Sequence, residues 1–131
     1  MQKEPREAGL DVRRAMFGPE HAERALERAT DFTRPMQELV TKYCFGEVWT
    51  REELPRKVRS MLTLAILVGL GRPDELKVHG KGALANGVSK DELREVLLHA
   101  MVYCGVPAGV SAFRQAAEVL REAGLEPAVQ S

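Results

Sequence analysis

Residues 61–70 read Met61-Leu62-Thr63-Leu64-Ala65-Ile66-Leu67-Val68-Gly69-Leu70, the most apolar run of the chain. Wound as a helix, this segment shows apolar side chains on every side, so we expect it to be buried on all sides. It is too short to span a bilayer, which needs about 20 apolar residues. The helix is expected to begin at Arg56 and to end at Gly71-Arg72-Pro73.

Three more helices are expected after this one. Pro73 can open a helix at its first turn, and Gly87 suits the position just past its end. Ser89 and Glu92 form the capping box of the next helix, which Gly105-Val106-Pro107 ends. The last helix is expected from about Ala108 to Ala123.

The last helix carries two apolar stripes. They are Phe113, Ala116, Ala117 and Leu120, and Ala112, Ala116, Val119 and Ala123. Because one stripe is enough to cover the core of a subunit, the second predicts an interface between subunits.

The part of the chain before Arg56 also has helical spacing. A first helix carries Leu10, Arg13, Arg14 and Phe17 and should end at Gly18-Pro19. A short charged helix, or an extension of the first one, is expected over residues 21–29, with His21 at the surface. Pro35 opens a helix whose apolar side chains are Met36, Leu39, Val40 and Tyr43, and Gly46 is expected to interrupt it.

The whole pattern predicts an all-α bundle of about six to seven helices in a single domain over residues 1–131. There are 19 basic and 19 acidic residues, so no excess of positive charge favours nonspecific binding of nucleic acid or anionic membranes. No apolar signal segment stands at the N-terminus, and we expect a cytoplasmic protein with reduced thiols.

His79 is the first candidate for chemistry. On a helix it shares a stripe with Leu76, Gly80 and Ala83. Small neighbours leave either close backbone contact or an open space, and a histidine facing a space can bind or move a proton near neutral pH. A hydrogen-bonded histidine in the core is the alternative.

Glu47 and Trp49 follow Gly46, where the backbone is expected to bend. A carboxylate beside aromatic surface is partly desolvated, which raises its pKa and suits acid–base work. An exposed Glu47 beside a Trp49 that anchors the corner is the alternative.

Basic residues are densest at Arg51, Arg56, Lys57 and Arg59, near the start of the central helix. Guanidinium groups at a helix N-terminus favour an anion site. Salt bridges to Glu52 and Glu53, or a solvated face, are the alternatives.

Two cysteines are present, Cys44 and Cys104, without the spacing of a metal site or a redox pair. Cys104 falls on an apolar stripe, where a thiol is usually an inert packing group. Glu95, His99 and Tyr103 form a row of ionisable groups that could line a site or a helix boundary.

Three segments carry a resemblance to a known family. They are Cys44-Phe45-Gly46-Glu47-Val48-Trp49-Thr50-Arg51, Leu54-Pro55-Arg56-Lys57-Val58-Arg59-Ser60 and Tyr103-Cys104-Gly105-Val106-Pro107. With the His79 segment, they resemble the 4-carboxymuconolactone decarboxylases over about residues 10 to 122. The wider superfamily includes thiol peroxidases of the alkylhydroperoxidase-D type, whose two cysteines are replaced here by Arg72 and Glu75. These peroxidases also have a glutamate one helix earlier, at a position that corresponds to about Ser60 here. The absence of both cysteines and of this glutamate argues against disulfide chemistry.

The resemblance implies decarboxylation of a small lactone dicarboxylate in protocatechuate catabolism, without cofactor or metal. It also implies a homo-oligomer, a trimer or hexamer. For this reaction we expect His79 and Glu47 to be catalytic and Arg51, Arg59 and Trp49 to bind the substrate. A thiol oxidoreductase and a non-catalytic helical assembly domain are the alternatives.

Overall fold

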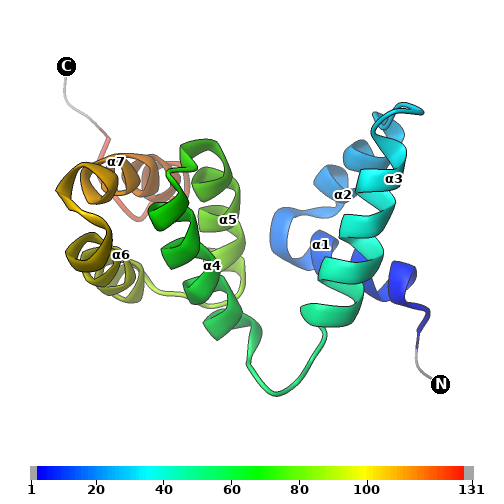
Figure 1. Cartoon of the computed structure of the whole chain (residues 1–131). Coiled ribbons are helices and arrows are strands. Elements are labelled where there is room, and N and C mark those ends of the chain that lie inside the picture. The colour runs from blue at the N-terminus through cyan, green and yellow to red at the C-terminus, as the bar shows by residue number, and fades with distance from the viewer. Residues whose placement is uncertain (1–2, 129–131) are drawn as a thin grey trace. The chain divides into compact units, whose positions relative to one another are not determined.

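The computed structural model describes residues 3–128 (Figure 1). Over those residues it holds seven α-helices, one π-helix and no strand, which confirms the all-α prediction there. The helices are α1 (Pro5–Phe17), α2 (Pro19–Glu27), α3 (Arg34–Leu39), η1 (Val40–Val48), α4 (Arg56–Leu70), α5 (Pro73–Ala85), α6 (Lys90–Cys104) and α7 (Val106–Glu122). They fall into two compact units, Met1–Arg56 and Lys57–Ser131.

The first unit is built where α1 crosses η1. Its core contains Val12, Met16 and Phe45, with Phe17, Val40 and Trp49 packed against them. Two glycines make the crossing close. A Cβ atom added at Gly9 would lie 2.8 Å from the carbonyl carbon of Thr41 and nearer still to its oxygen. One added at Gly46 would overlap the carbonyl of Pro5 in the same way.

The expectation that Gly46 interrupts its helix is wrong. The helix continues through it as the π-helix η1, and the N–H of Trp49 donates to the carbonyl of Cys44 over 2.9 Å. Gly46 is buried against α1, so its missing side chain serves a close contact between helices and not a bend.

The apolar side chains expected to mark the buried face of this helix are mostly on its outer face. Met36, Leu39 and Tyr43 are exposed, whereas Thr41 and Phe45 are buried against α1. A π-helix has more residues per turn than an α-helix. A buried face predicted from α-helical spacing therefore does not coincide with the residues that are buried in η1.

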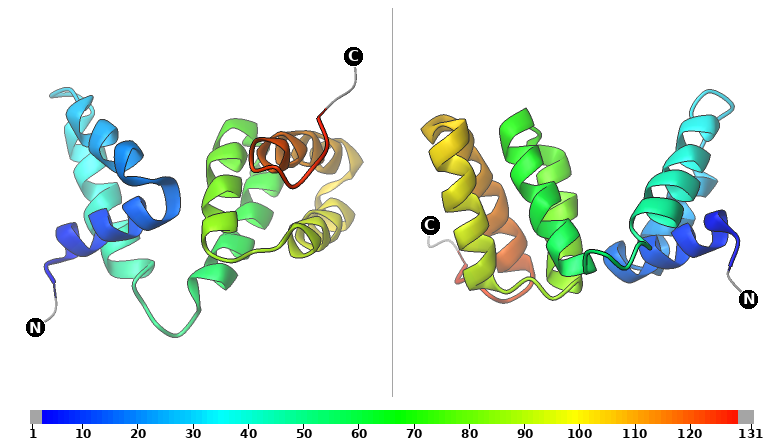
Figure 2. Two further views of the ribbon diagram at one scale, coloured as in Figure 1. Left: turned by 180° about the vertical axis from the view of Figure 1, so that it is seen from behind. Right: turned by 60° about the horizontal axis from the view of Figure 1, so that its bottom comes forward.

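The second unit packs α4, α5, α6 and α7 around one aliphatic core (Figure 2). The fully buried residues of this core include Leu64, Val68, Leu76, Leu93 and Leu97. Its local signals behave as the sequence predicts. Ser89 and Glu92 make both hydrogen bonds of a capping box, and Gly87 has a φ of 91° just past α5.

The prediction that the central helix is buried on all sides is wrong within this unit. α4 is buried on one side only, through Ser60, Leu64 and Val68, and exposes Leu62, Ile66 and Leu70. The helix neighbours in the unit cover a single face of it, so its opposite apolar face has no cover within the unit.

The two apolar stripes of α7, by contrast, are largely covered inside the unit. Ala112, Ala116 and Leu120 lie in the core, and Val119 is buried against Gly80 of α5. Because α5 and α6 both pack on α7, the double stripe is used inside the unit and does not itself indicate a subunit interface.

Candidate active site

His79 lies on α5 among small and buried residues. Leu76, Gly80 and Ala83 are buried as its stripe predicts, and the ring of His79 is half-buried. A Cβ atom at Gly80 would lie 3.3 Å from the nearest methyl group of Val119. The missing side chain of Gly80 therefore lets α7 approach closely. Of the two possibilities for small neighbours, close contact or an open space, Gly80 shows the close contact.

The imidazole of His79 is set to be neutral near pH 7. Burial lowers its pKa below the ordinary 6.5, and the carboxylate of Glu75, one turn earlier, opposes that shift. A neutral imidazole is at once an N–H donor and a nitrogen acceptor. At neutral pH, the single N–H of the neutral ring can therefore donate a hydrogen bond to a developing oxyanion.

Arg59 lies on α4, the partner of α5 in a helical hairpin. Asn86 directly follows α5 as its C-terminal cap residue. The side-chain amide of Asn86 donates to the hydroxyl of Ser60, the neighbour of Arg59, over 2.9 Å. This hydrogen bond joins the end of α5 to α4, one residue from Arg59.

The lowered pKa of His79 predicts how stability depends on pH. The unfolded chain takes up a proton first as the pH falls, because its histidine keeps the ordinary pKa of 6.5. The contribution of the neutral ring is fully present above pH 6.5 and is lost as the pH falls through the lower folded pKa. The free energy of unfolding of His79→Gln should therefore depend less on pH below 6.5 than that of the wild type, in urea titrations.

The pKa of His21 is lowered as well, by burial and by the charge of Arg13. His21 should therefore add to the same pH dependence of stability. A double variant, His21→Gln with His79→Gln, should show a flatter pH dependence than either single variant. Parallel stability curves for the wild type and His79→Gln would contradict the assigned direction of the shift.

The other predicted site residues lie at the end of η1 and in the segment that follows it. Trp49 stacks near Phe45, with ring centroids 5.9 Å apart, and so is fixed to the core of its unit. Trp49, Arg51 and Arg56 line one open hollow of about 400 Å³. Two guanidinium groups beside an indole suit a planar organic anion, and the carboxylate of Glu52 in the same lining opposes part of their charge.

Glu47 and Arg51 differ in part from the expectations. The carboxylate of Glu47 is exposed, so its own unit does not desolvate it. Arg51 pairs with Glu53 over 3.8 Å, as the salt-bridge alternative predicts. Both side chains of this pair are largely exposed, and such a pair is worth little and can exchange Glu53 for a ligand.

The remaining candidates are at the surface. Cys44 and Cys104 are both exposed thiols, so the prediction that Cys104 is buried is wrong. His99 is exposed with its ring 5.1 Å from that of Tyr103. Among residues 3–128, no three His, Cys, Asp or Glu side chains are grouped to hold a metal ion. Nor is any helix in this range long and apolar enough to cross a membrane.

One charged residue of the first unit was missed by sequence reasoning. Arg13 is only 6% exposed, and its guanidinium lies 5.6 Å from the centre of the Phe45 ring. The available signal was its position on one helical stripe with Leu10 and Phe17. An arginine on an apolar stripe is a candidate for a buried charge.

Comparisons with known proteins agree on the family. Residues 34–118 match the carboxymuconolactone decarboxylase family. A 4-carboxymuconolactone decarboxylase from Acinetobacter baylyi is 44% identical over 119 residues, which cover 91% of this chain and 89% of the relative. A nitrosuccinic acid decarboxylase from Metarhizium robertsii is 49% identical over 104 residues, or 79% of this chain and 73% of the relative.

A third relative, a 4-carboxymuconolactone decarboxylase from Pseudomonas putida, is 39% identical over 46 residues, or 35% of this chain and 96% of the relative. The match to the family covers more than half of the chain, and the match to the Acinetobacter protein spans nearly all of it. This chain therefore belongs to the carboxymuconolactone decarboxylase family.

Proposed function

We propose that this protein is a carboxy-lyase that converts 4-carboxymuconolactone to the β-ketoadipate enol-lactone without a cofactor or metal. The observation that carries the proposal is the 44% identity to the Acinetobacter decarboxylase, which extends over almost the full length of both chains. The half-buried His79, with Arg51 and Arg59, supplies residue types that the reaction needs.

The substrate provides its own electron sink. When the carbon–carbon bond to the departing carboxylate breaks, its electron pair moves through the ring double bond into the lactone carbonyl. CO₂ leaves, and a proton then adds to the ring carbon to give the enol-lactone. The protein has to hold the remaining carboxylate, stabilise the growing charge on the lactone oxygen and deliver the proton.

The predicted residues fit these tasks by their chemistry. Arg51 and Arg59 are assigned to the carboxylate and the lactone oxygen, since a guanidinium binds a carboxylate through two parallel hydrogen bonds. His79, neutral near pH 7, is assigned to donate to the lactone oxygen. Glu47 is assigned to carry the proton, and Trp49 to limit the access of water.

The direct test is an assay of the purified protein with 4-carboxymuconolactone in the presence of a strong chelator. We expect enol-lactone to form with one CO₂ released per substrate, at a rate that the chelator does not change. Substrate that decays no faster than in buffer would reject the proposal and favour a non-catalytic helical protein.

Nitrosuccinate is a second candidate substrate, because the nitrosuccinic acid decarboxylase is 49% identical over 79% of this chain. The two substrates share a pattern. Each is a dicarboxylate that loses one carboxylate, and each passes the electron pair to an oxygen sink, the lactone carbonyl or the nitro group. Comparing kcat/KM for both compounds on one preparation assigns the substrate, and a higher value for nitrosuccinate would replace the first proposal.

A thiol mechanism makes a separate prediction. Cys44 and Cys104 are exposed and lie in different units of the chain. We expect the double variant Cys44→Ser with Cys104→Ser to keep lactone turnover within about twofold of the wild type, because loss of a nucleophile costs far more than that. A loss of more than tenfold, or fast reaction of either native thiol with a thiol reagent at pH 6, would support the oxidoreductase alternative.

We further propose that the protein is a homo-oligomer in which a second copy covers the outer face of α4. On that face Leu62, Ile66 and Leu70 are 49%, 60% and 66% exposed and recur at four-residue intervals along one stripe. Val102 and Tyr103 on α6 are exposed even more. Contiguous apolar surface of this kind is rare on monomers and marks association.

Light scattering tests this assembly. The wild type is expected to be larger than 14.5 kDa, and Ile66→Glu is expected to shift it toward that mass, because a buried unpaired carboxylate opposes association. Leu125→Glu, which adds the same charge at an exposed leucine beyond α7, should leave the mass unchanged. A monomeric wild type would exclude the proposed cover.

A further inference from the structure

Arg13 is a buried cation without an anionic partner in the described chain. One guanidinium nitrogen, Nη1, donates to the side-chain oxygen of Gln37 over 3.2 Å and to the hydroxyl of Thr41 over 3.0 Å. Its Nε is buried and makes no hydrogen bond. Both acceptors are neutral, and burial lowers the pKa of the group with no carboxylate opposing the shift. A buried charge in this state is costly unless something of opposite charge joins it.

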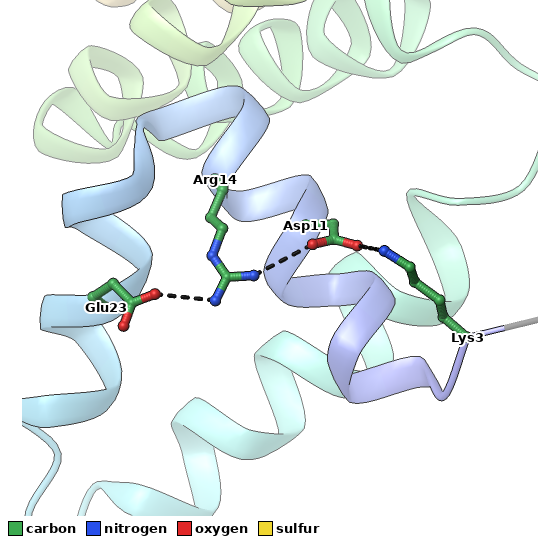
Figure 3. A network of polar contacts seen from close by, with 4 residues as sticks. All are labelled: Lys3, Asp11, Arg14 and Glu23. Carbon is green, nitrogen blue, oxygen red and sulfur yellow. Dashed lines mark hydrogen bonds and ion pairs between the residues drawn. The ribbon is translucent and has the colours of Figure 1, made fainter.

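The other arginines of α1, unlike Arg13, have carboxylate partners. Arg14 pairs with Asp11 and Glu23, and Asp11 in turn pairs with Lys3 (Figure 3). Arg6 pairs with Glu38 over 2.7 Å. These pairs are part-exposed, where a counter-charge is needed least. Carboxylates therefore accompany the exposed arginines of α1, while the buried one has only neutral oxygens.

A hollow of about 520 Å³ lies beside this group. Its lining residues are Phe17, Glu20, His21, Arg24, Ala25, Arg28, Ala29, Thr33 and Gln37. Two guanidinium groups and a single carboxylate are among them, and that carboxylate, on Glu20, already lies 3.5 Å from Arg24. Arg13 meets this wall through Gln37, which lines the hollow and accepts a hydrogen bond from the Arg13 guanidinium.

Gln37 connects the buried cation to the hollow. A guanidinium can only donate hydrogen bonds, so the amide oxygen of Gln37 faces Arg13 and the amide N–H₂ group remains for another acceptor. Since Gln37 lines the hollow, an anion bound there can accept from this amide while the amide oxygen stays on Arg13. The guanidinium polarises the amide and strengthens that second bond.

We propose that this hollow is a binding site for a small organic carboxylate, held by Gln37 and His21 and compensated by the charge of Arg13. An organic body is favoured over a bare inorganic ion because Phe17, Ala25 and Ala29 form an apolar part of the wall. The site lies wholly in the first unit, and the proposal does not depend on the decarboxylation reaction.

The test measures binding of succinate to the intact protein by calorimetry at constant ionic strength. We expect saturable binding of succinate and none of succinamide, the neutral compound of the same shape. Inorganic phosphate should bind at least about tenfold more weakly than succinate, because it leaves the apolar wall uncovered. Absent binding of succinate, or tighter binding of phosphate, would overturn the proposal.

Gln37→Glu is the sharpest variant. It keeps the size of the side chain but places a carboxylate on Arg13, which is then compensated from within the protein. We expect a higher midpoint of thermal unfolding and loss of succinate binding by more than about tenfold, since a like charge now occupies the site. Succinate affinity within twofold of the wild type would overturn the proposal.

Arg13→Met removes the buried charge at similar side-chain length, and Arg14→Gln is its matched control. Both variants lose one positive charge from α1, so a general attraction of anions to the helix would weaken equally in both. We expect Arg13→Met to lose binding and Arg14→Gln to keep it within about twofold. Equal losses in the two would overturn the assignment, and Gln37→Glu decides it if Arg13→Met does not fold.

Discussion

Replacing His79 with glutamine is expected to lower kcat for 4-carboxymuconolactone by about 10²–10⁴-fold, the usual range for a positioned acid–base or hydrogen-bonding group. Glutamine is close in size to histidine and still offers an amide N–H. It cannot exchange a proton near pH 7, and its amide does not occupy the position of the ring nitrogen. The ring is half-buried on α5, so circular dichroism and light scattering should confirm that the variant keeps its fold and mass.

The control for this experiment is His99→Gln. His99 is exposed on α6, with its ring against Tyr103, and we assign it no part in the reaction. Its variant should keep turnover within about twofold of the wild type. If His79→Gln also keeps near-normal turnover, His79 has no role in the mechanism.

Local signals in the sequence predict the second unit well. The capping box of Ser89 and Glu92, Pro73 at the start of α5 and the positive φ of Gly87 depend on residues within a few positions of one another. Such features need no knowledge of the tertiary fold, and for this reason the bounds of α5 and α6 follow closely from the sequence.

Features that depend on distant contacts could not be predicted in the same way. In the sequence alone, Gly46 indicates the interruption of a helix. Only its contact with α1 in the fold shows that packing leaves no room for a side chain there. The exposed side of α4 has a similar cause, because an apolar run does not say how many of its sides neighbours will cover.

The candidate site shows the same division. Sequence places His79 on a helix stripe, but it cannot tell that burial lowers the pKa of His79 or that Trp49 and Arg51 line one hollow. For Arg13 the charge on an apolar stripe was visible, whereas its neutral partners, Gln37 on α3 and Thr41 on η1, come from other helices. Their identity follows only from the way α1 packs against α3 and η1.

That crossing gives the largest expected effect on stability. Gly9→Ala should lower the free energy of unfolding of the first unit by at least about 2–3 kcal/mol. The added methyl group would overlap the backbone carbonyl of Thr41 and lie 3.0 Å from the backbone nitrogen of Gly46. Neither atom is the end of a flexible side chain, so the two helices must separate to admit it. Trp49, the only tryptophan, packs in this unit and reports its unfolding in urea by fluorescence.

Gly69→Ala is the matched control for the same substitution within a helix. Its added Cβ atom would lie 3.4 Å from the sulfur of Cys104, which is ordinary contact, and alanine favours a helix over glycine by about 0.8–1.0 kcal/mol. Circular dichroism should show this variant to be as stable as the wild type or slightly more so. If Gly9→Ala were also neutral, α1 and η1 could part without cost. Their close approach would then not be what holds Arg13 in its buried position.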